Sequence, residues 1–198
     1  MIKMICIISI CYGVWYLFLT PGSVSYGPGV FAPQAPTQQK IHSSKPKILL
    51  EGYTISSLAT FELKAKVLSR KNYSFGRESD LSPTDLALGW GRMSDESVLE
   101  SISISQSGRW YRWRSNTLPI PKQEIQISSA NMHMIPKNEW VREQLSQIKK
   151  GDVVTLSGNL VRVDAPDGWS WTSSLTRSDT GDGACEVVLV DNIVIAQM

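Results

Sequence analysis

The sequence has few of the side chains that build disulfides and metal sites. It contains three cysteines, Cys6, Cys11 and Cys185, and only the last lies outside the apolar N-terminal run. A disulfide within the folded part is therefore excluded. No pair of cysteines has CxxC spacing, and two histidines, His42 and His133, are too few for a site with several imidazole ligands. We therefore expect neither a metal nor another cofactor.

The chain also lacks a large excess of either charge. Its 20 Lys and Arg side chains oppose 18 Asp and Glu, which leaves a net charge of +2. A protein dedicated to nucleic acid usually carries a much larger basic excess, so this composition disfavours nucleic acid as the partner. Electrostatic recognition must then come from a local cluster. With 42% hydrophobic residues, the 198-residue chain can build one domain and a tail.

One long run without charge stands near the N-terminus. Residues 4–19 contain no charged side chain, Lys3 precedes them, and the next charged residue is Lys40. A helix of this length spans about 24 Å, which is short of the roughly 30 Å hydrocarbon core. The run therefore fits both a signal peptide and a short transmembrane anchor. The positive charge ahead of it predicts a cytoplasmic N-terminus, with the rest of the chain on the outer side.

The fate of this run stays open between two alternatives. Trp15 and Tyr16, near its outer end, are typical of the aromatic belt of a retained anchor. Ser23 and Ser25 are small residues of the kind that signal peptidase requires, which favours cleavage near Ser25. We expect either a single-pass protein of the bacterial inner membrane, with its C-terminal domain in the periplasm, or a protein secreted to the periplasm.

The rest of the chain divides into a linker and one domain. Residues 21–47 include five prolines and show no hydrophobic period, which predicts a partly extended linker. Within the domain, residues 48–198, strict alternation over 60–69 predicts a half-buried strand. Residues 152–163 and 185–196 have the strongest strand patterns of the chain. Gly158 inside the former predicts a bulge or a sharp bend.

Between these strands the patterns indicate helices and a hairpin. Residues 82–99 predict an insertion of two short helices, which begin at Ser82 and Ser94. A Ser-Gly turn joins the alternating strands 100–105 and 109–114, which predicts a hairpin. A helix over 135–151 is predicted to begin at the cap Asn138.

The predicted order is strand, insertion, two strands, helix, strand, strand. This order resembles the OB fold, a five-stranded barrel, in the position of the helix before the fourth strand. The stretch KGDVVTLSGNLVRV, residues 150–163, is similar to the fourth-strand segment of many OB-fold proteins. The resemblance covers residues 100–196 and the first strand. It implies a mainly β fold with an OB-like barrel of five core strands.

Four further stretches resemble a family of uncharacterised bacterial proteins that are membrane-anchored or exported. They are PGVFAP (28–33), DLALGWGRMSD (85–95), SANMHMIP (129–136) and GWSWTSSLTRSDTGDGACE (168–186). This resemblance implies a location in the envelope, and it implies no activity.

The stretch RWYRWR alternates cations and aromatic rings. On a strand, its side chains divide between two faces, which carry Arg109, Tyr111 and Trp113 on one side and Trp110, Arg112 and Arg114 on the other. One interpretation is a platform for single-stranded nucleic acid, an anionic glycan or a lipid headgroup. In the structural alternative, one face packs on the barrel and arginine stems cover the other. We expect a barrel strand first and a recognition surface second.

The loop 168–185 joins the last two predicted strands, where OB folds often border their binding face. Trp169 and Trp171 are candidates for stacking on a ligand, and Arg177 and Asp179 are candidates for polar contacts. The structural alternative packs the tryptophans over the barrel and uses the Arg177–Asp179 pair to fix the turn.

Catalysis has less support in the sequence. Cys185 and His133 are a possible thiol nucleophile and base, but nothing in the sequence brings them together. Cys185 also opens an apolar strand, where buried and inert thiols are usual.

We therefore expect a non-catalytic binding or assembly module on the outer side of the bacterial inner membrane. Its partner is an envelope protein or an anionic envelope component, contacted through RWYRWR and the loop 168–185. The alternative is an envelope hydrolase that uses a serine or cysteine with His133 and an aspartate. A third and weaker alternative is an OB domain that binds single-stranded nucleic acid.

Overall fold

The structure is a computed structural model that describes residues 22–42, 46–176 and 185–197. The apolar run 4–19 and the two loop residues Arg177 and Asp179 lie outside these ranges. Within the described part of the chain, every helix falls short of the length and apolar character needed to cross a bilayer.

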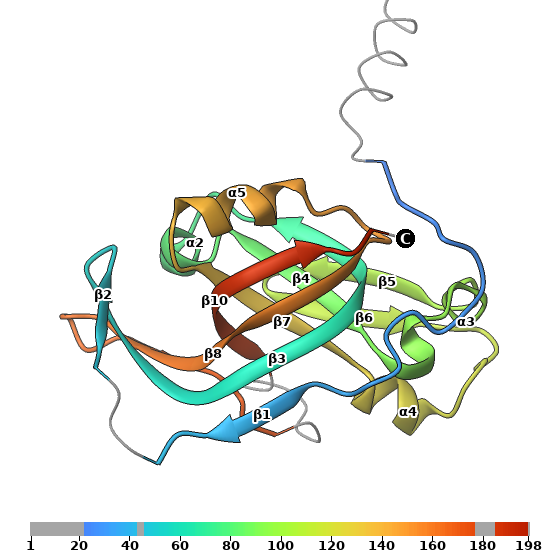
Figure 1. Ribbon diagram of the computed structural model, residues 1–198, viewed down its shortest axis with the longest axis horizontal. Coiled ribbons are helices and arrows are strands. Elements are labelled where there is room, and N and C mark those ends of the chain that lie inside the picture. The colour runs from blue at the N-terminus through green and yellow to red at the C-terminus, as the bar shows by residue number, and fades with distance from the viewer. Residues whose placement is uncertain (1–21, 43–45, 177–184, 198) are drawn as a thin grey trace, which may run out of the picture.

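The fold is mainly β, as the sequence predicts (Figure 1). The main sheet contains β1 (Thr37–Lys40), β2 (Ile48–Leu50), β3 (Tyr53–Asn72), β4 (Thr84–Gly89), β7 (Ser129–Pro136), β8 (Val153–Asp164), β9 (Ser170–Thr172) and β10 (Glu186–Ile195). A second sheet contains only β5 (Ser103–Ser107) and β6 (Trp110–Arg114). The predicted strands 60–69, 152–163 and 185–196 correspond to β3, β8 and β10.

Five strands of the main sheet pair in a closed circuit. β3 pairs with β4, β4 with β7, β7 with β10, β10 with β8, and β8 again with β3. The β7–β10 pair is parallel and the others are antiparallel. All five strands contribute side chains to one buried core cluster, which includes Phe61, Leu88, Met132, Leu156 and Val188.

The predicted irregularity at Gly158 is present where β8 meets β10. A Cβ atom at this position would lie 2.2 Å from the carbonyl oxygen of Leu189, so glycine is needed for the two backbones to approach. The pairing shifts register next to it, between Val190 and Asn192, which places the extra residue on β10. The bulge therefore lies on the strand that faces the glycine.

Helix α5 (Glu139–Gln147) connects β7 to β8, and Figure 1 shows it above β10. Asn138 caps it as predicted, because its Oδ1 accepts a hydrogen bond of 3.0 Å from the backbone N–H of Val141. Val141 and Leu145 are buried in the main core cluster. The helix is shorter than the predicted range 135–151.

The prediction of a helix beginning at Ser82 is wrong. Residues 84–89 form β4, which lies between β3 and β7 and is buried along its whole length. A strand covered on both faces has no alternation of apolar and polar residues, and its Ser-Pro-Thr-Asp start resembles a helix cap. The rest of the predicted insertion is helical, in η1 (Gly91–Ser94) and α3 (Glu96–Leu99).

The prediction that RWYRWR is a strand of the core circuit is also wrong. β5 and β6 pair with each other in a separate sheet. The second and third strands of the circuit are instead β4 and β7. The sequence suggested no strand over 129–136, where β7 is also buried along nearly its whole length. The hairpin is instead an insertion between β4 and β7, and α4 (Lys122–Ile127) follows it.

The described part of the proline-rich segment lies against the domain. β1 pairs with β3, and Val30 forms a β-bridge with Asp95. Ala32 is fully buried, and its backbone N–H donates a hydrogen bond of 3.0 Å to Oγ of Ser94. This segment, rich in proline and glycine, therefore follows an extended path along the domain, whereas its composition predicted only a linker.

Candidate functional site

The hairpin of β5 and β6 has a packed face and an exposed face. Tyr111 and Trp113 are half-buried and pack on a cluster that includes Ala87 of β4. The side chains that alternate with them are exposed, namely Trp110, Arg112 and Arg114. The two faces predicted from the alternation are both present. Burial raises the pKa of Tyr111 to about 12, against a lowering by its hydrogen bond with Ser129.

The exposed face carries cations without acidic partners. In the part of the chain that the structure describes, neither Arg112 nor Arg114 forms an ion pair. Their cross-strand neighbours are Ser105 and Ser103, both exposed and uncharged. Residues two apart on a strand stand about 6.6 Å apart. The two guanidinium groups therefore form a short cationic row.

Arg109 has a different role, because it stands at the tip of the hairpin. Its φ of 69° follows a φ of 58° at Gly108, as a two-residue type I′ turn requires. Its Nη1 donates hydrogen bonds of 2.7 Å to Oδ1 of Asp85 and 2.8 Å to the carbonyl oxygen of Ser82. Its guanidinium carbon lies 4.0 Å from the ring centre of Tyr73. Arg109 therefore fastens the tip to the main sheet.

Asp85 is the fully buried centre of a polar cluster beneath the hairpin tip. Its Oδ1 lies 2.9 Å from Nδ1 of His133, which stands opposite it on β7. The ring orientation falls short of hydrogen-bond geometry, so this is a close polar contact. Asn131 lies in the same cluster, and its Nδ2 donates to the backbone oxygen of Arg109 at 3.0 Å. A buried carboxylate needs such partners to offset its lost hydration.

Cys185 lies near this cluster. Cys185 directly precedes β10, whose first residue, Glu186, pairs with β7. The cysteine is half-buried. The fold thus brings Cys185 and His133 into one region, which the sequence could not indicate.

Trp169 and Trp171 belong to a row of four aromatic rings. The distances between ring centres are 5.9 Å for Tyr53–Trp169, 6.3 Å for Trp169–Trp171 and 4.8 Å for Trp171–His133. Arg77, the first residue of α2 (Arg77–Leu81), lies over Trp169 at 5.4 Å. Both tryptophans are half-buried and pack on a core cluster. They cover the core and keep part of their surface exposed.

The structure thus connects two motifs that are distant in the sequence. Arg109 of the hairpin contacts Asp85, Asp85 contacts His133, and His133 contacts Trp171. The sequence did not single out Asp85, because a helix that begins at Ser82 would place this residue in its first turn. The available signal was an acidic residue directly before the apolar run LALG.

Comparison of the chain with family models, with curated proteins and with the solved structures finds no match.

Proposed function

We propose that the protein is a non-catalytic binding module, tethered to the outer side of the bacterial inner membrane by residues 4–19. We further propose that the exposed face of its hairpin binds an anionic polymer of the cell envelope. One observation carries the proposal. Arg109 is engaged by Asp85, whereas Arg112 and Arg114 of the same motif are exposed and have no ion-pair partner among the described residues.

The chemistry of this face suits a chain of phosphates or carboxylates. A guanidinium group donates paired hydrogen bonds to either anion, and two in a row match successive charges on a polymer. Trp110, which is 37% exposed, adds a flat apolar surface beside them. Ser103 and Ser105 add hydroxyl donors on the same face. An anion bound here meets no carboxylate on the hairpin.

The closed circuit of five strands supports a second part of the proposal, that the domain is an OB-like barrel. Its spatial order, its parallel pair β7–β10 and the helix α5 before β8 are those expected for that fold. OB folds bind ligands on their second and third strands, which here correspond to β4 and β7. The hairpin packs over this surface, so its own outer face is the one that remains exposed to a ligand.

A hydrolase is the second candidate, because the contact between His133 and Asp85 resembles a base held by a carboxylate. Arg109 binds the same carboxylate oxygen, and the side chain of His133 is only 4% exposed, which opposes this role. Assays on envelope extracts decide the question. Hydrolysis that C185A abolishes and R112A/R114A leaves intact would favour the enzyme.

Binding to isolated envelope polymers tests the leading proposal. The full chain in detergent is titrated with each polymer, and R112A/R114A is compared with R142A/R162A. The control removes a half-buried arginine and an exposed one, Arg142 and Arg162, which already have the acidic partners Glu139 and Asp164. We expect the hairpin variant to bind at least about tenfold more weakly, since hydrogen bonds to charged groups contribute about 1.5–3 kcal/mol. Equal affinities of the two variants would reject the hairpin as the contact surface.

A further inference from the structure

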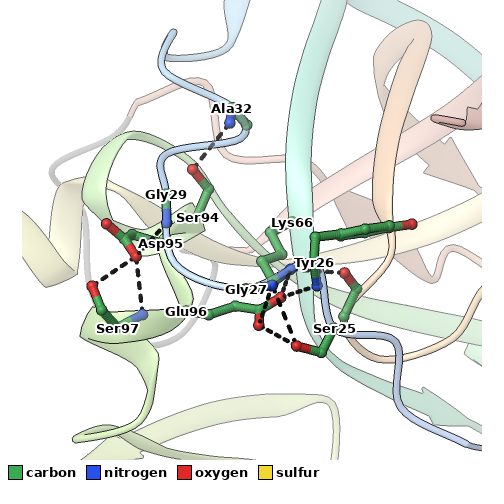
Figure 2. A network of polar contacts seen from close by, with 11 residues as sticks. Ser25, Tyr26, Gly27, Gly29, Ala32, Lys66, Ser94, Asp95, Glu96 and Ser97 are labelled. Carbon is green, nitrogen blue, oxygen red and sulfur yellow. Dashed lines mark hydrogen bonds and ion pairs between the residues drawn. The ribbon is translucent and has the colours of Figure 1, made fainter. Parts of the chain in front are cut away.

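The first described residues are held on the domain by Glu96 (Figure 2). Its carboxylate accepts hydrogen bonds from Nζ of Lys66 at 2.7 Å and from the backbone N–H groups of Tyr26 at 2.8 Å and Gly27 at 3.1 Å. Lys66 is 3% exposed and also donates to the carbonyl oxygen of Gly151 at 2.9 Å. Burial opposes ionisation of Glu96, but the hydrogen bonds from Lys66, from the Ser25 hydroxyl and from the backbone of Tyr26 outweigh it and lower its pKa to about 2.

The chain is also fixed one step earlier, at Val24. The backbone N–H of Val24 donates a hydrogen bond of 2.8 Å to the carbonyl oxygen of Lys150. Leu19, the last residue of the apolar run, precedes Val24 by five residues, and a fully extended chain covers at most about 18 Å over that distance. If residues 4–19 anchor the protein, as proposed above, the turn at Lys150 lies within about 18 Å of the outer end of the anchor, close to the lipid headgroups.

A cleft of about 360 Å³ opens beside this turn. Ser23 and Val24 form part of its wall, between β3 and the segment that leads into β5. Five aliphatic side chains border it, of which Val67, Leu68 and Ile102 are buried and Leu99 and Ile104 are half-buried. The volume is within the range of small-ligand sites, and the exposed parts of Leu99 and Ile104 offer a contact to an apolar ligand group.

The charged groups of the cleft fall into two pairs of different kind. Lys66 and Glu96 neutralise each other at 2.7 Å. Lys150 and Glu100 also line the cleft and are exposed, and among the described residues neither forms an ion pair. The cleft therefore presents one uncompensated cation and one uncompensated carboxylate. A ligand that satisfies both must carry an anion and a cation.

We propose that this cleft binds one zwitterionic phospholipid of the ethanolamine type. The phosphate pairs with Lys150, the ammonium group with Glu100, and an acyl chain packs on the aliphatic lining. The site rests on the proposed membrane tether, because that tether places the cleft at the bilayer. It is independent of polymer binding at the hairpin.

Three soluble probes test the assignment on the full chain, held in an amphipol belt and analysed by native mass spectrometry. They are dihexanoyl phosphatidylethanolamine, dihexanoyl phosphatidylglycerol and glycerophosphoethanolamine. We expect the first to bind at least tenfold more tightly than the second, which lacks the ammonium group. We expect no binding of the third, which lacks acyl chains. Equal binding of the two lipids would overturn the proposal, and tight binding of glycerophosphoethanolamine would replace it with a soluble zwitterion.

Charge-reversal variants locate the site. K150E and E100K should each lose at least tenfold in affinity for the ethanolamine lipid, while K149E and E139K, which reverse exposed charges outside the cleft lining, should retain it. An equal loss in K149E and K150E would contradict a specific cleft. Polymer binding at the hairpin, measured on the same samples, should be unchanged in E100K. A failure of the lipid proposal is thus distinguished from a failure of the proposed polymer binding, because each is measured with its own ligand.

Discussion

Nη1 of Arg109 lies 2.7 Å from Oδ1 of Asp85, so the tip of the inserted hairpin is fastened to the main sheet by an ion pair whose carboxylate is fully buried. This pair separates the arginines of RWYRWR by role. Arg109 fastens the hairpin to the domain, whereas Arg112 and Arg114 form the exposed cationic row.

Replacement of Arg109 should destabilise the fold, whereas replacement of Arg112 should not. R109A leaves the buried carboxylate of Asp85 without its cation, a change that costs about 3–5 kcal/mol in other proteins. For a domain of this size we expect the melting temperature to fall by roughly 6–20 °C. Thermal unfolding followed by circular dichroism measures it, with R112A as the control. Equal melting temperatures of the two variants would disprove the role of Arg109.

Gly151 should resist substitution more strongly than Gly108, although both have positive φ, 94° and 58°. A Cβ atom at Gly151 would lie 1.7 Å from the carbonyl oxygen of Val24, whereas one at Gly108 meets nothing closer than 4.0 Å. G151A must therefore displace the N-terminal segment in addition to the strain of a left-handed alanine. We expect G151A, but not G108A, to expose the chain around Val24 to proteolysis. Identical digestion patterns of G151A and G108A would argue against the contact.

Glu96 should make the stability of the fold depend on pH in the acidic range. Its pKa falls from 4.5 to about 2 on folding, so the ionised form stabilises the native state. The contribution is complete above about pH 4.5 and is lost as the pH falls toward 2. E96Q should lower the stability at pH 7 by up to about 3 kcal/mol, because a tenfold change in an acid constant corresponds to about 1.4 kcal/mol. The variant should also show a weaker decline in melting temperature between pH 5 and 2.5.

Parallel melting curves of wild type and E96Q over this range would contradict that assignment. A decline that persists in E96Q is expected from other carboxylates whose pKa is lowered. Glu124, for example, pairs with Arg92, and Asp167 pairs with Arg77. The contribution of Glu96 is therefore measured by the difference between the melting temperatures of wild type and E96Q at each pH, and not by the slope of either curve alone.

Local features of the fold could be predicted from the sequence because they depend on neighbouring residues. The Asn138 cap, the strands β8 and β10, and the close approach at Gly158 are of this kind. β4 could not be predicted, because a strand buried on both faces shows no period.

Long-range contacts account for what the sequence concealed at the candidate site. The alternation of RWYRWR separated its two faces, but packing against Ala87 decides which one is exposed. The partnership of Asp85 with Arg109 depends on the hairpin folding back over β4. The attachment of Tyr26 to Glu96 spans 70 residues of chain, so composition indicated only a linker.

The most direct test of the central claim is the salt dependence of binding to dextran sulfate, with neutral dextran as the control. Each arginine that neutralises an anionic group of the polymer releases counterions, so the plot of log affinity against log salt concentration has a slope proportional to the number of contacts. The account predicts that R112A/R114A lowers the magnitude of this slope by about 1.5 relative to wild type and weakens binding at every salt concentration. Superimposable plots of the two proteins would contradict it.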